Sequence, residues 1–245
     1  MPHEVSVVIA ARNEESLVGD AVRSAFDAGA IEVLVVDGSS TDATAEVALR
    51  AGARVIASEP MRAQQLNAGA KIARGTALIF LHADTTLPSG AAAAVATALD
   101  SGAHFGGFRI AFVERAWRLR FAAAMINLRT RITRCPWGDQ AQFIARSRFM
   151  EEGGYRWMPL LEDYEMAVRM KRHAVVLPLT VTTSGRRFVA KGVLRTAWIN
   201  WRIITMYRMG VDPGRLAERY RCAGGGPGGG YPERSEGSTD STGDD

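Results

Sequence analysis

Cysteine is scarce in this chain of 245 residues, where Cys135 and Cys222 stand far apart and in no metal-ligand spacing. Two such thiols argue against a disulfide framework and favour a reducing compartment. Long apolar runs are also missing, because no uncharged stretch reaches the roughly 18 residues that a membrane-spanning helix needs. The N-terminal segment lacks a basic stretch followed by an apolar one, so it is not predicted to be a signal peptide. These absences predict a cytoplasmic protein.

Apolar residues are nearly missing from residues 223–245, which consist mainly of glycine, proline, serine, threonine and acids. Such a composition buries too little surface to offset the entropy of ordering, so a disordered tail is predicted. The tail has five acids and one base, a net charge of −4, which leaves +8 on residues 1–222 because the whole chain carries +4. A basic domain suits phosphate-bearing ligands, nucleic acid or an anionic membrane, and charge alone does not choose among them.

A glycine-rich phosphate loop is absent after the first apolar run, where residues 10–15 read Ala-Ala-Arg-Asn-Glu-Glu. Its absence argues against an ordinary dinucleotide-binding fold and against a Walker-type loop. It also argues against a nucleotidyltransferase, a class that carries a glycine-rich signature at this place. No nucleic-acid recognition motif occurs, and the bases are scattered over predicted helices, so we expect no nucleic-acid partner.

Short β-branched runs alternate with helical patterns through the first hundred residues. Strands are predicted at residues 5–10, 31–36, 53–57 and 76–81, and helices at 14–28, from about 42 to 50, at 61–73 and at 88–102. The strands are apolar nearly throughout, as expected when both faces of a parallel sheet are covered. Four such units in a row predict an α/β protein with an open, mostly parallel sheet and helices on both faces.

The second half of the sequence has a less regular pattern. Strands are predicted at residues 105–113, 140–146 and 175–181, and helices at 115–131, 161–172 and 192–209. No internal repeat occurs, and no linker divides the chain. Residues 1–222 are therefore expected to form one domain, in which about 191–210 make a C-terminal amphipathic helix.

Acids follow two predicted strands at their carboxyl ends, where ligands bind in open parallel sheets. Asp84 comes soon after the fourth strand, where a carboxylate is costly unless it is paired, caps a helix or binds a metal. It is either a capping or loop acid or an oxygen ligand for a divalent ion, which takes one or two protein carboxylates beside phosphate and water. Asp37 follows the second strand and is either a turn acid or an acceptor for a nucleotide base or ribose.

Six segments of the sequence together resemble a known family. They are residues 6–15, 35–42, 62–69, 81–85, 138–140 and 161–165. Their order and spacing, over about residues 1–187, are similar to those of the GT-A glycosyltransferases of family 2. The resemblance implies a Rossmann-like GT-A domain with a nucleotide-binding half at about 1–102 and an acceptor half at about 103–190.

The resemblance also implies what individual residues do. Asp163 matches the general base, and Asp84 matches the metal ligand, with Mg²⁺ or Mn²⁺ as the cofactor. The positions on the donor side are Ala11, Arg12, Glu14, Asp37, Arg62, Asn67, His82 and Ala83, and those expected near acceptor or phosphate are Gln140, Glu162 and Arg187. The chain departs from the family at His82, which stands where the metal motif has its first acid.

The implied reaction moves a sugar from a nucleotide diphosphate donor, expected to be linked to UDP, with inversion at the anomeric carbon. A divalent ion on Asp84 would offset the charge of the leaving diphosphate. A carboxylate must take the acceptor's proton, because a hydroxyl does not lose it unaided at neutral pH. Apart from the resemblance, Asp163 has a plain explanation as an acid stabilised by the dipole of a helix start. The alternative function is a non-catalytic sugar-nucleotide-binding protein.

The predicted helices at 115–131 and 191–209 are both apolar and basic. Each either packs against the domain or lies as an amphipathic helix on an anionic membrane. Because related enzymes often glycosylate lipids, carotenoid acids among them, the resemblance admits a lipid or carotenoid-like acceptor. It also admits peripheral contact with the inner face of the cell membrane.

Overall fold

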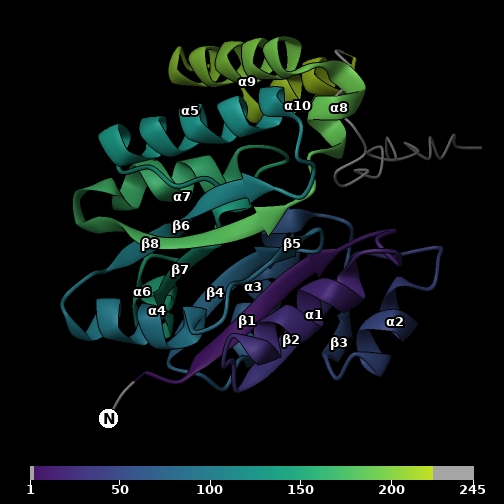
Figure 1. Cartoon of the computed structure of the whole chain (residues 1–245), viewed down its shortest axis with the longest axis vertical. Coiled ribbons are helices and arrows are strands. Elements are labelled where there is room, and N and C mark those ends of the chain that lie inside the picture. Colours follow the sequence, from purple (N-terminus) through teal and green to yellow (C-terminus); the bar gives the residue numbers. More distant parts are fainter. Residues whose placement is uncertain (1–2, 223–245) are drawn as a thin grey trace, which may run out of the picture.

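Eight strands form one sheet in the order β3-β2-β1-β4-β7-β6-β8-β5 in the computed structural model, which describes residues 3–222 (Figure 1). The strands are β1 (Val5–Ala11), β2 (Glu32–Asp37), β3 (Arg54–Ala57), β4 (Ala77–His82), β5 (Thr85–Thr86), β6 (Phe105–Phe112), β7 (Gln142–Ala145) and β8 (Ala174–Thr183). The tail predicted at 223–245 lies outside the described residues.

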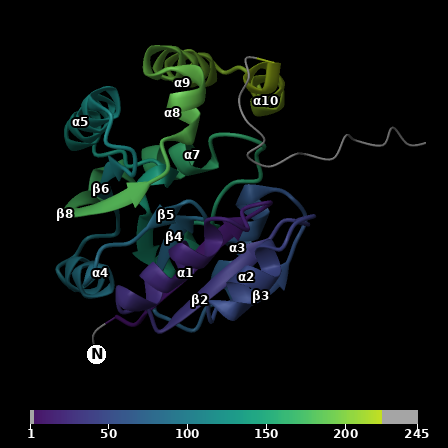
Figure 2. The same ribbon diagram turned by 45° about the vertical axis from the view of Figure 1, so that its right-hand side comes forward.

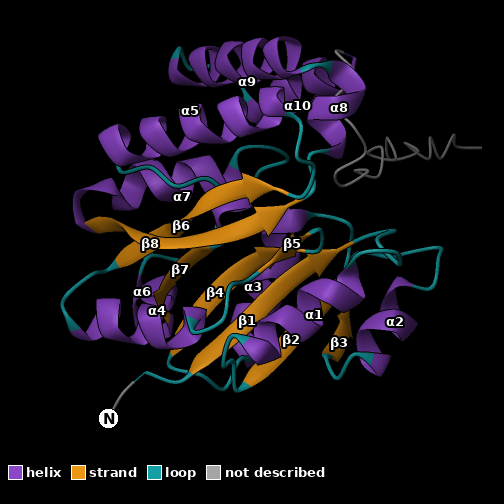
Figure 3. Ribbon diagram, in the orientation of Figure 1, coloured by secondary structure: helices purple, strands orange, loops and turns teal. Residues whose placement is uncertain are grey.

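Helices lie on both faces of this sheet (Figure 3). They are α1 (Val18–Asp27), α2 (Thr44–Arg50), α3 (Arg62–Ile72), α4 (Ala91–Asp100), α5 (Trp117–Thr133), α6 (Arg146–Glu151), α7 (Glu162–Met170), α8 (Arg186–Lys191), α9 (Val193–Arg208) and α10 (Pro213–Cys222). Two short 3-10 helices, η1 (Gly138–Gln140) and η2 (Lys171–His173), precede β7 and β8. None of the helices within residues 3–222 is long and apolar enough to cross a membrane.

Alternate residues of the central strands face two separate cores. Val7 and Ile9 of β1 belong to one fully buried cluster, and Val8, between them, belongs to the other. This is the period of two that a strand imposes on its side chains. Because both faces are covered, β1 must be apolar nearly throughout, as its sequence predicts.

The parallel sheet predicted from the first half is confirmed, since β3, β2, β1 and β4 pair in parallel. The second half differs from a continued parallel sheet. There β7 runs antiparallel to both β4 and β6, while β6 and β8 pair in parallel. The two-residue strand β5 closes the far edge by pairing antiparallel to β8. A continuous sheet thus joins the two halves of the chain and brings the end of β4 beside α7 and α8.

Candidate functional site

A cavity of about 520 Å³ opens at the carboxyl ends of β1 and β4. Both halves of the chain line it. From the sequence-predicted set, the lining includes Ala11, Arg12, Glu14, Arg62, His82, Ala83, Asp84, Glu162, Asp163 and Arg187. The volume falls within the usual range for small-molecule sites. The cavity therefore lies at the sheet edge where the carboxyl-end rule expects a ligand, and the topology brings the predicted residues of α7 and α8 to the same edge.

Three polar atoms of the cavity converge on Gly138. A Cβ atom at this position would lie 2.6 Å from Oδ2 of Asp163, 2.9 Å from Nε2 of His82 and 3.1 Å from Nη2 of Arg62. A side chain here would displace the Asp163 and His82 side chains and crowd Arg62, so glycine lets all three keep these positions. The general-base candidate, the histidine and an arginine thus share one small volume.

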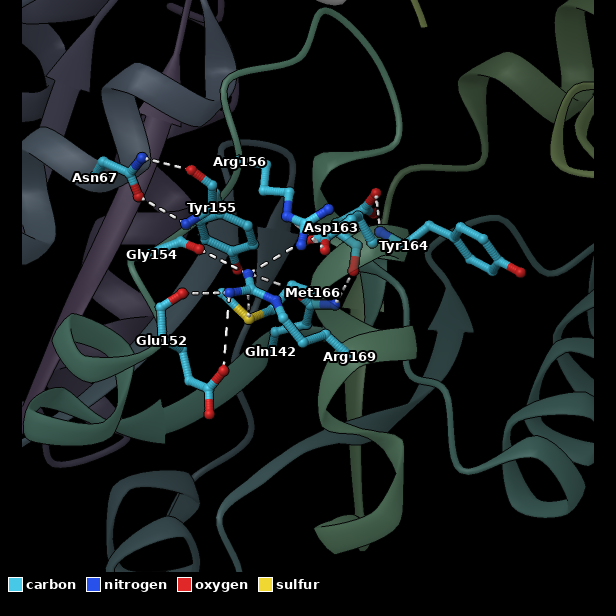
Figure 4. A network of polar contacts seen from close by, with 11 residues as sticks. Asn67, Gln142, Glu152, Gly154, Tyr155, Arg156, Asp163, Tyr164, Met166 and Arg169 are labelled. Atoms are coloured by element: carbon cyan, nitrogen blue, oxygen red, sulfur yellow. Dashed lines mark hydrogen bonds and ion pairs between the residues drawn. The ribbon is translucent and has the colours of Figure 1, made fainter. Parts of the chain in front are cut away.

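The start of α7 holds Asp163 in place. Its Oδ2 accepts the backbone N–H of Gly138 at 2.6 Å, and its Oδ1 accepts that of Tyr164 at 2.7 Å. Its backbone carbonyl accepts the side-chain amide of Gln142 at 2.8 Å, and the Tyr155 hydroxyl donates to Gln142 at 2.8 Å (Figure 4). These bonds connect α7 to β7, so the carboxylate lies on a rigid part of the fold.

His82 is a neutral imidazole. Burial lowers its pKa well below the ordinary value, and the positive charges of Arg62 and Arg187 lower it further. Its Nε2 is inaccessible to solvent and has no hydrogen-bond partner within the described residues. Since a buried polar nitrogen without a partner is costly, this atom is suited to a ligand that enters the cavity. The chain therefore places a neutral hydrogen-bonding group where the family motif has a charge.

Glu162 stands next to Asp163 and ion-pairs with Arg62, with 3.2 Å between Oε1 and Nε. Burial raises the pKa of Glu162 to about 7, and the neighbouring Asp163 carboxylate adds to this rise. Arg62 acts in the opposite direction. Because Glu162 holds Arg62 in the cavity, its protonation near neutral pH would release a guanidinium toward an anionic ligand.

Asp139 is an acid of the cavity that our sequence analysis missed. Burial raises its pKa to about 6, although Arg129 lowers it in part. Its Oδ1 has no hydrogen-bond partner among the described residues. The family resemblance had directed attention to its neighbour Gln140. The sequence indicated that the polar segment 138–140 reaches the site. It did not indicate which of its side chains faces the cavity.

Asp84 follows β4 and meets a positive charge from the other half of the chain. Nη2 of Arg186 lies 3.4 Å from Oδ2 of Asp84, and the same guanidinium donates to Oε1 of Glu14. The second oxygen of Glu14 is buried and has no hydrogen-bond partner in the described part of the chain. Two carboxylates thus face one cationic group at the mouth of the cavity.

The side chains at the mouth of the cavity would hold a divalent ion only together with a bound ligand. The described residues contain no cluster of three or more histidine, cysteine or acidic side chains that would hold a metal alone. Mg²⁺, however, is commonly bound by one or two carboxylates together with phosphate oxygens and water. Asp84 with a bound diphosphate meets this requirement.

Three sequence-predicted residues lie outside the cavity lining. Gln140 is fully buried and its amide is used within the protein, donating to the Phe108 carbonyl and accepting from Thr130. Its side chain therefore does not face an acceptor or phosphate, which corrects our expectation. The side-chain amide of Asn67 is likewise used within the protein, because it forms hydrogen bonds with the backbone N–H and carbonyl of Tyr155 (Figure 4).

Asp37 lies one strand away from the cavity. It is paired in register with Ala11, which does line the cavity, and its carboxylate accepts the backbone N–H and hydroxyl of Ser40. Gln65, which our sequence analysis did not single out, lines the cavity and donates to the carbonyls of Ala11 and Val36. It joins the ends of β1 and β2, which places Asp37 beside the cavity edge.

Apart from Leu161, which belongs to the segment 161–165, the remaining wall comes from segments that were not predicted to reach the site. The loop before α7 contributes Pro159, Leu160 and Leu161, α9 contributes Asn200, Ile203 and Ile204, and α10 contributes Ala217, Tyr220 and Arg221. This wall is largely apolar, whereas the wall at β1 and β4 is largely charged. The cavity is thus divided into a polar part and an apolar part.

Solved structures share this architecture at low sequence identity. The mannosyltransferase PcManGT from Pyrobaculum calidifontis, in complex with GDP-Man and Mn²⁺, aligns with TM-score 0.60 and 17% identity over 90% of this chain and 70% of that one. S. aureus TarS in complex with UDP aligns with TM-score 0.59 and 17% identity over 78% and 63%. Glucosyl-3-phosphoglycerate synthase from Mycobacterium tuberculosis aligns with TM-score 0.56 and 16% identity over 79% and 77%.

This chain spans less than two thirds of the TarS chains that it matches. No curated protein matches it in sequence. The chain has the GT-A architecture of these solved structures, with a cavity at the sheet edge. The model of Glycosyl transferase family 2 matches residues 6–159, more than half of the chain. The chain belongs to that family.

Proposed function

We propose that the protein transfers a sugar from a nucleoside diphosphate donor, UDP-linked in the first instance, to a hydrophobic alcohol, with inversion. The observation that carries the proposal is that Asp84 and Asp163, from opposite halves of the chain, line one cavity together with five arginines. Two of the solved relatives are complexes with UDP and one with GDP-Man. A cation-rich wall beside a separate carboxylate suits an anionic leaving group and a protonated nucleophile.

The polar part of the cavity suits the donor. Arg62, Arg186 and Arg187 can pair with diphosphate oxygens, since guanidinium groups bind phosphate through several N–H donors. The neutral Nε2 of His82, which has no hydrogen-bond partner in residues 3–222, can hydrogen-bond the same ligand. Asp84 would hold Mg²⁺ or Mn²⁺, which would stabilise the charge that develops on the diphosphate.

Asp163 is suited to take the acceptor's proton. Its carboxylate is fixed by two backbone N–H groups and faces the same volume as His82 and Arg62. A single base that assists direct attack from the face opposite the leaving group gives inversion. The apolar wall from α9 and the loop before α7 suits an acceptor whose hydroxyl is attached to a hydrophobic body.

Calorimetry and turnover together test the proposal. UDP and GDP are titrated into the protein with and without Mn²⁺, and the preferred nucleotide identifies the donor for hydrolysis and transfer assays. Asp163→Asn should retain nucleotide affinity and lose about 10²- to 10⁴-fold in turnover, the usual contribution of a general base. Asp27→Asn, at the exposed end of α1, is the matched control.

Two outcomes would overturn the proposal. If neither nucleotide binds, the cavity does not accept a nucleoside diphosphate. If a nucleotide binds but the native protein and Asp163→Asn hydrolyse the donor equally slowly, the non-catalytic binding function is favoured instead.

A further inference from the structure

The outer face of α5 is apolar and exposed. Trp117, Phe121, Leu128 and Ile132 are 72%, 58%, 49% and 73% exposed. Their spacing of four, seven and four residues places them on one side of the helix. Leu119 and Ala122, on the opposite side, are buried. The helix therefore packs by one face and leaves a second apolar face uncovered.

The outer face of α9 repeats this arrangement. Leu194, Trp198 and Trp201 are 84%, 55% and 65% exposed and stand four and three residues apart. Ile199 and Ile203 are buried on the inner side. Large exposed apolar groups that cluster on one surface mark an interaction site more often than scattered ones do.

Positive charge accompanies both apolar faces. Residues 115–134 and 186–211 contain no acid and twelve lysines and arginines, of which Arg186 and Arg187 line the cavity and Arg129 packs against Trp137. Two arginines lie against exposed tryptophans, Arg118 over Trp117 at 5.6 Å and Arg202 over Trp198 at 5.3 Å. Aromatic and aliphatic groups flanked by bases, without acids, are typical of helices that lie in the headgroup region of an anionic bilayer.

The two helices are neighbours at one end of the molecule. α5 contacts α9, and Figures 1 and 2 both place them at the end of the molecule opposite the N-terminus. We name these outer faces together the α5–α9 face. The inner side of α9 carries Asn200 and Ile203, which line the cavity. A single helix thus has the α5–α9 face on one side and the apolar wall of the cavity on the other.

We propose that the α5–α9 face docks the protein on an anionic lipid bilayer, with the helices parallel to the membrane surface. A second copy of the chain is a poorer occupant, because a two-fold interface would bring the same bases face to face. The proposal rests on the proposed function in one respect: docking would hold the apolar wall of the cavity, on the inner side of α9, one helix away from a bilayer that contains an amphiphilic acceptor.

Flotation of the full chain with vesicles tests the docking. The protein should float with vesicles of phosphatidylcholine and phosphatidylglycerol and much less with phosphatidylcholine alone. The double variant Arg195→Gln with Arg202→Gln should lose about fivefold in partitioning for each base removed. The double variant Trp198→Ser with Trp201→Ser should lose binding to the anionic vesicles as well. Circular dichroism checks that each variant is folded.

Matched controls come from α2, on another part of the surface. Leu49→Ser and Arg50→Gln remove an exposed apolar and an exposed basic side chain there and should leave flotation unchanged. The proposal is overturned if the native protein ignores anionic vesicles or binds neutral ones equally well. It is also overturned if the tryptophan variant instead abolishes self-association in sedimentation. Nucleotide affinity, measured in the same variants, should not change, which separates a failure of docking from a failure of the proposed function.

Discussion

At the residue scale, Arg186 contacts the carboxylate that is proposed to hold a divalent ion, that of Asp84. Its guanidinium pairs with Asp84 and Glu14 at the mouth of the cavity. A divalent ion on Asp84, as proposed, would therefore compete with this guanidinium for the carboxylate, and a diphosphate that enters the cavity would draw the arginine toward itself. The pairing keeps the acids at the cavity mouth from repelling an incoming anion.

We expect Arg186→Met to bind Mn²⁺ more tightly than the native protein when no nucleotide is present. The gain should reach at most about fivefold, because a partly exposed ion pair is worth roughly 0.2–1 kcal/mol. Titration of free Mn²⁺ by electron paramagnetic resonance measures it. Arg187→Met is the matched control, and Asp84→Asn should remove the binding. Equal affinities in Arg186→Met and the native protein would show that the two cations do not compete.

Asp139 is a buried acid whose raised pKa has a consequence for stability. Burial raises its pKa to about 6 from the ordinary 3.8. Between these values the folded protein keeps a proton that the unfolded chain releases. The free energy of unfolding therefore falls as the pH rises through this window and stays at the lower value above it.

Asp139→Asn removes this titration. Well above pH 6 the variant should unfold with a free energy about 1–3 kcal/mol higher than the native protein. Below 3.8 the two proteins should agree, because the native carboxyl is then protonated in both states. Urea denaturation at both pH values measures the difference, with the exposed Asp100→Asn as control. A variant that is less stable at the higher pH would show that the Asp139 carboxylate stabilises the fold.

The mistake at Gln140 has a physical reason at this scale. Residues 138–140 form a 3-10 helix, in which three residues complete a turn. Successive side chains therefore point in different directions, and Asp139 reaches the cavity while Gln140 enters the core. Spacing along the sequence located the segment correctly. It did not identify the inward-facing residue, because that depends on how the turn packs against β6 and α7.

At the scale of elements, periodicity in the sequence predicted most helices and strands to within a few residues. The strand predicted at 76–81 is β4 at Ala77–His82, and the helix predicted at 61–73 is α3 at Arg62–Ile72. α10 was missed, since only Leu216 and Ala217 of its ten residues are buried and no apolar stripe marks it. The antiparallel pairing of β7 was also missed, because it depends on contacts between distant strands.

α10 should be the least stable part of the cavity wall. A small cluster of buried residues, Ile199, Ile203 and Leu216, holds it to α9, apart from the two main cores. Leu216→Ala removes the central side chain, and Leu→Ala in a core costs about 2–5 kcal/mol. We expect fast amide exchange over 213–222 in this variant, without a matching loss of global stability.

Leu66→Ala, in a main core, is the comparison for this exchange experiment. It should lower the melting temperature of the whole protein rather than open α10 alone. Unchanged exchange over 213–222 in Leu216→Ala would show that α10 is held by contacts other than this cluster.

At the scale of the whole molecule, the continuous sheet makes the two halves one cooperative unit. The antiparallel pair of β4 and β7 joins the half that carries Asp84 to the half that carries Asp163. A ligand that touches both halves should therefore stabilise the entire chain. A domain whose core is shared in this way usually unfolds in a single transition.

Thermal unfolding with and without UDP and Mn²⁺ tests whether the two halves unfold together. At a ligand concentration about 100 times the dissociation constant, binding should add about 2.7 kcal/mol to the free energy of unfolding and shift one transition as a whole. In Asp84→Asn the same ligands should shift the unfolding transition much less, because the variant lacks the carboxylate proposed to hold the metal against the diphosphate. Two transitions, of which the ligand moves only the first, would mean that the nucleotide contacts the β1–β4 half alone. The acceptor half would then need a second ligand to close the site, and Asp163 would not be in place when the donor binds.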